Sequence, residues 1–399
     1  MNTKRTVLCL AAMALFMAGP ALAADPKYDT SSYFGPKMSY GVTDEFLAKA
    51  RADESLKAKP LRLYDITDAD LAKAAVLADI VTGLEIESGK GITDLSPLAK
   101  FTNLTYLKLD SLKSVKTLAP LAALTKMAKL HVRQVEYPDL AFLAPMNDLT
   151  ELVFFMQPKG IKDISPLKGK TKLKKLSFYA APIEDISALS EFKDLEELDL
   201  YMTEVKDLSP IAGLAKLKKL GLYSIPATDL SPVGNLTELR YIWIYATKCD
   251  DYSPLAKLVK LEEFHGGISK FSDMKVVETM PNLRIVKMLR EELTNLASLA
   301  KCPKLSEVVL ESVTGTIDLS IFANMAKLAR LDVEGSTVTN PEAIAKLPAL
   351  SALDVQKTQG IADFSTFKDL PKLQYIYAKV GQFPPEQIAP YGKKAIIQK

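Results

Sequence analysis

The sequence predicts an α/β solenoid, in which short coils stack side by side and each adds one strand to a long parallel sheet. The first observation is a period of 22 to 24 residues that returns fourteen times from Val81 onward. The second is a change of pattern within each period, from the alternation of a strand to the start signal of a short helix. A fixed period in this range indicates coils that bury their apolar edges only against their neighbours.

Apolar residues at matching positions define the period. The segment that begins at Leu195 continues through Leu198, Leu200 and Val205, and the same series restarts at Leu217. The fourteen periods start at Val81, Leu104, Met127, Leu149, Leu173, Leu195, Leu217, Leu239, Leu261, Leu283, Leu305, Leu328, Leu350 and Leu373.

Each period contains two local structures. It opens on L-x-x-L-x-L, as at Leu195, Leu198 and Leu200, and this alternation is typical of a strand with one buried face. It closes on Asp-x-Ser-Pro, as at 207–210 and 229–232. Serine at the N-cap and proline at the first helical position predict a single α or 3₁₀ turn there. We therefore expect the strands on the concave side of the stack and the turns on its convex side.

The first 23 residues have the features of a signal peptide. Lys4 and Arg5 precede an apolar run over 7–18, and Ala21 and Ala23 form an A-x-A cleavage site. The run is too short to span a membrane, and no other stretch approaches the ~20 apolar residues that a transmembrane segment needs. We expect four parts: a signal peptide (1–23), an N-terminal arm and cap (24–80), a solenoid of about fourteen repeats (81–380) and a C-terminal cap (381–399). The product should be exported, either to the periplasm or out of the cell.

The charge and cysteine content exclude some classes of function. Removal of Lys4 and Arg5 lowers the basic count from 51 to 49 against 48 acidic residues, so the mature net charge is 49 − 48 = +1. A nucleic-acid-binding protein needs a clustered basic excess, so we expect no nucleic-acid partner. Cys249 and Cys302 occupy core positions of their periods, and we interpret them as buried hydrophobic residues outside any disulfide.

The periodic pattern resembles a known family. L-x-x-L-x-L followed by x-I-x-D-L-S-P-L-x-x-L is similar to the leucine-rich repeat of the 22-residue, internalin-like class, and the resemblance extends from Val81 to Lys379. It implies a right-handed leucine-rich-repeat solenoid with a parallel concave sheet and short α or 3₁₀ turns on the convex side. Residues 66–71 resemble the capping segment that precedes such arrays.

The chain departs from this family at one position. Eight residues after each period start, where the family places asparagine, it has Thr203, Thr247, Thr358, Ser269, Ser336, Ala181 and Ile225. The buried asparagine ladder is therefore absent or replaced by hydroxyl groups. Internalins also carry surface anchors that this sequence lacks, so the resemblance does not by itself imply their role.

The second, fourth and sixth residues after each start should point out of the concave face, and they vary along the chain. A basic group comes first, an aromatic group follows, and the later strands are acidic, with Glu307, Glu311, Asp332, Glu334 and Asp354 around Arg330. This order of basic, aromatic and acidic groups along the concave face would fix the orientation in which a ligand binds. The candidate ligand-binding residues are Lys129, His131, Arg133, Phe155, Tyr179, Tyr201, Tyr223, Tyr241, Trp243, Tyr245 and His265.

Five of these aromatic residues share the sixth position in successive periods, so their rings should align. The only tryptophan, Trp243, lies beside them. Exposed tyrosine and tryptophan are enriched at binding hot spots, and a contiguous aromatic patch indicates an interaction site. The alternative is a ladder of rings whose stacking only stabilises the sheet.

Other signals favour structure over chemistry. Asp185, Asp207, Asp229, Asp251 and Asp273 recur once per coil, and we interpret them as turn caps and not as calcium ligands, which must converge in space. His131 and His265 lie six coils apart, too far to share a metal. No grouped catalytic set is present, so we expect no enzyme activity, no cofactor and no metal.

The sequence favours an exported, non-catalytic recognition protein that binds a protein or peptide ligand on its concave aromatic face. A second reading is a binder of cell-envelope glycans, in which the same rings stack on sugar faces. Glu197, Asp199 and Lys219 would then bond the sugar hydroxyl groups.

Overall fold

The computed structural model describes residues 41–398 apart from 90, 136, 138, 157–159 and 392–394. The predicted signal peptide (1–23) and the arm up to residue 40 lie outside the described residues, so these two predictions stay untested.

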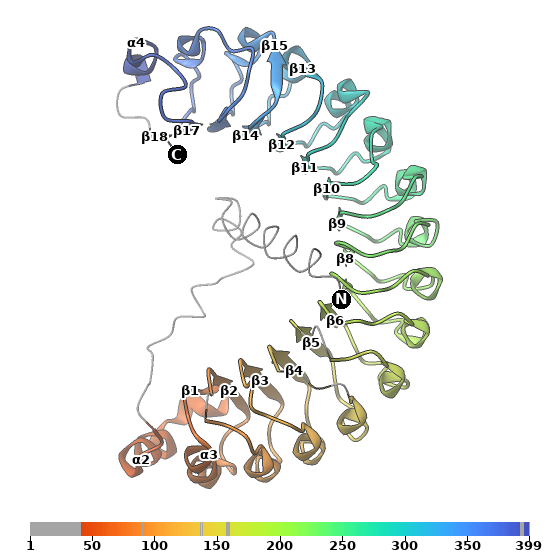
Figure 1. The fold of residues 1–399 in the computed structure, drawn as a ribbon, viewed down its shortest axis with the longest axis vertical. Coiled ribbons are helices and arrows are strands. Elements are labelled where there is room, and N and C mark those ends of the chain that lie inside the picture. Colours follow the sequence, from red (N-terminus) through yellow and green to blue (C-terminus); the bar gives the residue numbers. More distant parts are fainter. Residues whose placement is uncertain are drawn as a thin grey trace. The chain divides into compact units, whose positions relative to one another are not determined.

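In the described part of the chain, sixteen strands form one parallel sheet in sequence order, except that two short strands, β13 and β15, pair with each other. The strands line the inner side of the arc and the 3₁₀ turns its outer side (Figure 1). The strands of the main sheet are β1 (Leu61–Tyr64), β2 (Gly83–Glu87), β3 (Tyr106–Asp110), β4 (Lys129–Arg133), β5 (Glu151–Phe155), β6 (Lys175–Tyr179), β7 (Glu197–Asp199), β8 (Lys219–Gly221), β9 (Tyr241–Tyr245), β10 (Glu263–Gly267), β11 (Ile285–Leu289), β12 (Glu307–Glu311), β14 (Arg330–Asp332), β16 (Ala352–Asp354), β17 (Tyr375–Ala378) and β18 (Ala395–Gln398).

The sheet is longer than the fourteen predicted strands because one strand is added at each end. β1 precedes the first period and pairs in register with β2, with Leu61 opposite Leu84. Its residues alternate between buried and exposed, as in the coils that follow. β18 comes after the last period and pairs with β17.

The N-terminal end of the solenoid is covered by α2 (Asp44–Ala52) and α3 (Asp68–Ala74). Helix α2 ends at Ala52, and a 3₁₀ turn follows it after Asp53. Thr67 and Asp70 form a capping box at the start of α3, in which each side chain bonds the other's backbone N–H. Asp70 also accepts a hydrogen bond from the backbone N–H of Val42 at 2.8 Å, which ties the start of the described chain to the cap.

The outer turns are 3₁₀ helices, and each follows its strand after a short loop. Within the described residues the remaining helix is α4 (Pro385–Ile388), and β13 (Thr316–Asp318) pairs with β15 (Thr337–Thr339). The 3₁₀ helices span Glu54–Lys57, Ala75–Leu77, Ser96–Lys100, Ala119–Ala123, Ala141–Leu143, Ser165–Leu167, Ser187–Glu191, Ser209–Ile211, Val233–Asn235, Ser253–Lys257, Met274–Thr279, Leu296–Lys301, Leu319–Phe322, Pro341–Ile344, Phe364–Phe367 and Ala389–Tyr391.

Aspartate, and not the predicted serine, caps these turns. Ser209 is the first residue of its turn, and its backbone N–H donates to Asp207 Oδ1 at 2.8 Å. The same bond joins Ser165 to Asp163 at 2.8 Å. These hydrogen bonds stabilise the charged carboxylates and lower the pKa of Asp163, Asp207 and Asp229. The recurring aspartates are therefore turn caps, as expected, and the described residues contain no group of three side chains that could hold a metal.

Hydroxyl groups replace the asparagine ladder at several coils. Thr203 Oγ1 donates to the carbonyl of Leu200 at 2.9 Å, and Ser336 Oγ donates to that of Leu310 at 2.8 Å. At Ala181 and Ile225 the position is filled by a buried apolar side chain instead. Cys249 and Cys302 are buried free thiols in the apolar core, as predicted.

A left-handed residue ends the strand segment of almost every coil, seven residues after the period start. Twelve of these positions hold residues other than glycine: Ser88, Ser111, Gln134, Met156, Ala180, Met202, Ser224, Ala246, Ile268, Arg290, Ser312 and Lys357. Ile268 is the only β-branched residue among them, with φ 53°, and its side chain is 47% exposed. A β-branched residue in this region is strained because its Cβ crowds the backbone.

We therefore expect Ile268→Gly to stabilise the protein by about 1 kcal/mol, because glycine adopts this conformation freely and little packing is lost. The midpoint of thermal unfolding measures the effect. Val259 is equally exposed, at 47%, and lies outside the left-handed region, so Val259→Gly should destabilise. Destabilisation by both variants would contradict the strain at Ile268.

Candidate binding face

The concave face consists of three columns of side chains that run across the strands. The parallel register places Glu151, Lys175, Glu197, Lys219 and Tyr241 opposite one another on successive strands, and we call this the charged column. The middle column follows two residues later and includes Asp199, Gly221, Trp243 and His265. The aromatic column is Phe155, Tyr179, Tyr201, Tyr223 and Tyr245, two residues later again.

The rings of the aromatic column lie next to one another, as predicted. Their centroids are separated by 4.4, 5.9, 6.3 and 6.2 Å in order along the column. Phe155 and Tyr179 are stacked, whereas Tyr201 is nearly perpendicular to both of its neighbours. These are favourable aromatic geometries, so part of the column's role is to join the coils.

Tyr245 differs from the other four because its side chain is buried, with only 3% exposed. Burial raises the pKa of its hydroxyl group. The expectation that all five rings are exposed is therefore wrong at this position, and Phe155, Tyr179, Tyr201 and Tyr223 form the accessible part of the column. Alternation along a strand predicts which side a residue takes, but not how far its neighbours cover it.

Trp243 belongs to a second aromatic group on the same face. Its ring is stacked with that of Tyr241 at 6.3 Å and contacts His265 edge-on at 5.6 Å. Lys219 Nζ lies 5.7 Å from the centre of the Tyr241 ring, which is a cation–π contact. Tyr241 and Trp243 are partly exposed. His265 was expected to be exposed, but only 12% of its side chain is, because Trp243 and Lys287 flank it in register.

The three basic candidates have acidic partners. Glu151 bonds His131 Nε2 at 2.9 Å and lies 3.7 Å from Lys129 Nζ, while Arg133 lies 3.6 Å from Asp110. The Arg133 guanidinium also covers the Phe155 ring at 4.8 Å. The predicted basic end of the face is therefore compensated by acids of the same surface. His131 and His265 are on β4 and β10 and do not meet.

Glu151 is the centre of this ionic group. Burial alone would raise its pKa, but the hydrogen bond from His131 and the charge of Lys175, 3.2 Å away, lower it to about 2. Ion pairs continue along the charged column, since Lys175 lies 3.9 Å from Glu197, and Glu197 lies 2.6 Å from Lys219. Positive and negative side chains thus alternate from coil to coil.

The sequence reasoning missed the role of Gly221. A Cβ atom at this position would lie 2.6 Å from Cζ of Tyr201 and 2.8 Å from Oδ1 of Asp199, so both side chains use the space that the glycine leaves. Asp199 is only partly exposed, and the burial of its carboxylate raises its pKa to about 6. A glycine inside a strand pattern indicates close approach of another group, and that signal was present in the sequence.

The later strands carry the acidic group that the sequence indicates, but two of its members are buried. Asp332 and Asp354 lie opposite each other on β14 and β16, at 7% and 3% exposure. Burial and the charge of Asp332 raise the pKa of Asp354 to about 7. Arg330 compensates the pair in part, at 3.3 Å from Asp332.

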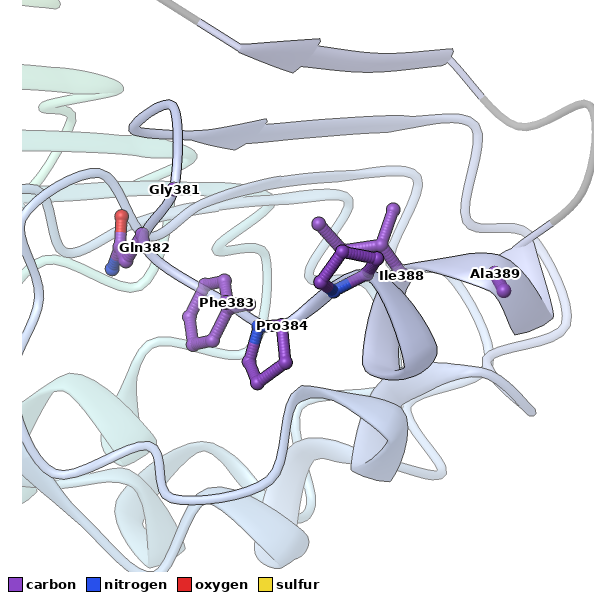
Figure 2. A pocket seen from close by; sticks show the side chains of 7 residues that line it. Gly381, Gln382, Phe383, Pro384, Ile388 and Ala389 are labelled. Atoms are coloured by element: carbon purple, nitrogen blue, oxygen red, sulfur yellow. The ribbon is translucent and has the colours of Figure 1, made fainter.

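A separate cavity of about 690 Å³ lies near the C-terminal end, away from the predicted site (Figure 2). Figure 2 shows Phe383, Pro384 and Ile388 around it, and Gly381, Gln382, Pro385 and Ala389 complete the lining. No lining residue is titratable, and the Gln382 side chain accepts a hydrogen bond from the backbone N–H of Lys379 at 2.9 Å. The cavity therefore lacks groups for chemistry.

No protein-family model and no curated protein matches the sequence. Solved structures do resemble it. A leucine-rich-repeat protein of Leptospira interrogans is 18% identical, with a TM-score of 0.74 and coverage of 90% of this chain and 92% of the other. An internalin of Listeria monocytogenes is 24% identical, with a TM-score of 0.61 and coverage of 82% and 94%.

A third similar structure comes from a plant. The leucine-rich-repeat ectodomain of a membrane receptor kinase of Arabidopsis thaliana is 16% identical, with a TM-score of 0.54 and coverage of 81% of this chain and 45% of the other. At these identities the likeness shows the fold, which is the leucine-rich-repeat solenoid of the internalin-like type that the periodicity indicates. Among the described helices, none is long and apolar enough to span a bilayer.

Proposed function

We propose that this chain is an exported, non-catalytic recognition protein that binds a protein or peptide on its concave aromatic face. The observation that carries this proposal is the row of four partly exposed rings in the aromatic column, with the stacked pair of Tyr241 and Trp243 on the same sheet. The contact residues are Phe155, Tyr179, Tyr201, Tyr223, Tyr241 and Trp243. Large rings with few rotatable bonds supply contact area at a small cost in entropy.

The charges beside the rings support a ligand that is held mainly by apolar contact. The pairs Glu197–Lys219 and Glu151–Lys175 compensate each other within the face, at 2.6 and 3.2 Å. A ligand that bonded these groups would first have to break those pairs. Protein interfaces combine such aromatic anchors with a paired polar rim. Lys129, His131, Arg133 and His265 then act at the margins of the site.

Two further observations support the recognition role. The Arabidopsis receptor ectodomain was solved in complex with Casparian strip integrity factor 2, so a solenoid of this fold can hold a separate ligand. The perturbed carboxyl groups of the concave face do not form a grouped catalytic set in the described residues. Export, to the periplasm or beyond, rests on the basic, apolar and A-x-A segments of residues 1–23.

The test uses a random dodecamer peptide library displayed on phage and selected on the immobilised protein. We expect selected peptides to change the fluorescence of Trp243, the only tryptophan. Tyr201→Ala should weaken their binding at least about tenfold, as for a hot-spot ring. The control is Tyr375→Ala, because Tyr375 is on β17 of the same sheet and is 46% exposed but lies outside the aromatic column.

Each outcome decides between the readings. Peptides whose affinity is unchanged in Tyr201→Ala would contradict the proposed face. A protein that selects no peptide but binds defined oligosaccharides on a glycan array, with the same loss in Tyr201→Ala, would support the glycan alternative. A protein that binds neither would leave the rings as a ladder that joins the coils.

A further inference from the structure

His265 differs from the other histidine of the chain because its Nε2 atom is buried without a hydrogen-bond partner among the described residues. The nearest carboxylate oxygen, Glu263 Oε2, is 3.5 Å away. His131, in contrast, bonds Glu151 at 2.9 Å. A buried polar atom without a partner is costly, and natural proteins seldom retain one without a use.

Burial and the nearby charge of Lys287 disfavour a positive charge on the imidazole in this position, and they outweigh the opposite effect of Glu263 and Glu307. On β11, Lys287 lies opposite His265, and its own ion pair with Glu307 on β12 is 3.0 Å long. On β10, the carboxylate of Glu263, which is the one nearest to His265, also forms an ion pair with Arg284 at 3.4 Å. On β9, the facing residue is Trp243, whose ring contacts the imidazole at 5.6 Å. Little of the ring reaches water, which could otherwise stabilise the cation.

We propose that His265 is a pH-operated latch of the aromatic face: the neutral imidazole packs against Trp243 and holds it in place, and protonation expels the imidazole and displaces Trp243. The latch itself needs no ligand. Its effect on ligand affinity rests on the proposed function, because Trp243 is one of the proposed contact residues.

The direction of the switch follows from burial. Burial lowers the pKa of His265 below the ordinary histidine value of about 6.5, so the ring is neutral at pH 7.5. As the pH falls below this value, the unfolded or expelled imidazole takes up a proton more readily than the packed one. The packed arrangement is therefore favoured above about pH 6.5 and is lost as the pH falls through the lowered pKa.

The first test is the fluorescence of the ligand-free protein between pH 8 and pH 4.5. Because Trp243 is the only tryptophan, its emission reports this site alone. We expect a sigmoidal change with a midpoint below about pH 6.5 in the wild type. His265→Gln should abolish the change and His131→Gln should preserve it. An unchanged transition in His265→Gln would overturn the proposal, as would a wild type whose emission does not titrate.

Asp199 is the control for a competing origin of the signal. It lies in the middle column two strands from Trp243, and its pKa of about 6 falls in the same range. If Asp199→Asn abolishes the transition and His265→Gln does not, the latch is refuted. The chain has two histidines, so NMR of their imidazole carbons follows each ring directly in the wild type, even if a variant folds poorly. A His265 ring that titrates without any shift of Trp243 resonances would also refute the latch.

The final measurement links the latch to binding. One pH unit below the midpoint, about a tenth of the molecules keep the neutral ring, so a selected dodecamer peptide should bind about tenfold more weakly than at pH 7.5. In His265→Gln this loss should disappear. Peptide binding that ignores the transition of Trp243 would overturn the coupling. A transition without peptide binding at any pH would instead reject the proposed function and leave the latch intact.

Discussion

The variant Asp354→Asn should unfold at a higher temperature than the wild type at pH 8, and this gain should be clearly smaller at pH 5. Asp354 is 3% exposed and faces Asp332 across two paired strands. Burial and this like charge raise its pKa to about 7. A pKa above the unfolded value means that folding is favoured by the protonated form. This contribution is complete below about pH 3.9 and is lost as the pH rises through 7.

The size of the effect follows from the shift. About three pKa units correspond to roughly 4 kcal/mol, and we expect about 2–4 kcal/mol of stabilisation at pH 8 because Asp332 shares the proton. The asparagine oxygen can still accept the hydrogen bond from the backbone N–H of Gln356, now 3.1 Å long. Thermal unfolding monitored by circular dichroism at the two pH values measures the difference.

A control for this prediction lies in the same coil. Asp363 is an exposed turn cap whose pKa is lowered by hydrogen bonds from Ser365, so Asp363→Asn should not stabilise the protein at pH 8. If Asp354→Asn changes the unfolding temperature equally at pH 5 and pH 8, the carboxyl group is not protonated in the native state as inferred here.

Glu151→Gln should have the opposite effect and destabilise the protein at pH 7. The shift of the Glu151 pKa to about 2 corresponds to roughly 3 kcal/mol, and we expect about 2 kcal/mol because the group is partly solvated. A lowered pKa means that the stabilisation is present above about pH 4.3 and is lost as the pH falls through 2. The difference in the free energy of unfolding between the wild type and Glu151→Gln should therefore shrink as the pH falls from about 4.3 to 2. Chemical denaturation at several pH values measures it.

The comparison for this variant is Glu197→Gln, which removes the next carboxylate of the charged column. Glu197 is 32% exposed, so its pair with Lys219 should contribute only about 0.2–1 kcal/mol. Equal losses in the two variants would show that Glu151 has no special position as the partner of His131, Lys129 and Lys175.

The fold was predictable because each coil repeats the same pattern of apolar residues. The leucines at 195, 198 and 200 set a strand, and the aspartate and Ser-Pro at 207–210 set the turn. The apolar series returns fourteen times, and Ser-Pro returns in five of these periods. The extra strands β1 and β18 were missed because each belongs to a segment without a complete period. Ser209 was wrongly placed at the N-cap because serine is common there. In the structure it is the first residue of its turn, and its backbone N–H donates to Asp207.

For the candidate site, the alternation of residues along each strand predicted which side chains share a column, but not how exposed they are. Register and period place Tyr179, Tyr201 and Tyr223 in one column, and their rings do meet. Exposure was wrong at Tyr245 and His265, because it depends on the sizes of neighbours on adjacent strands. Ligand binding by these rings depends on the surface and on its partner, and the repeat pattern carries no information about either.

Between β4 and β8, the alternating charged column makes two coils, and not one, the unit by which the solenoid can lengthen or shorten. Removal of a single coil would place Lys175 beside Lys219, or Glu151 beside Glu197, where opposite charges now pair at 3.2 and 2.6 Å. The outer flank follows the same rule, since Lys172 pairs with Asp148 and Lys216 pairs with Asp194, each at 2.6 Å. Insertions, deletions and engineered extensions should therefore be tolerated in pairs, with segments of about 44 residues exchanged as blocks.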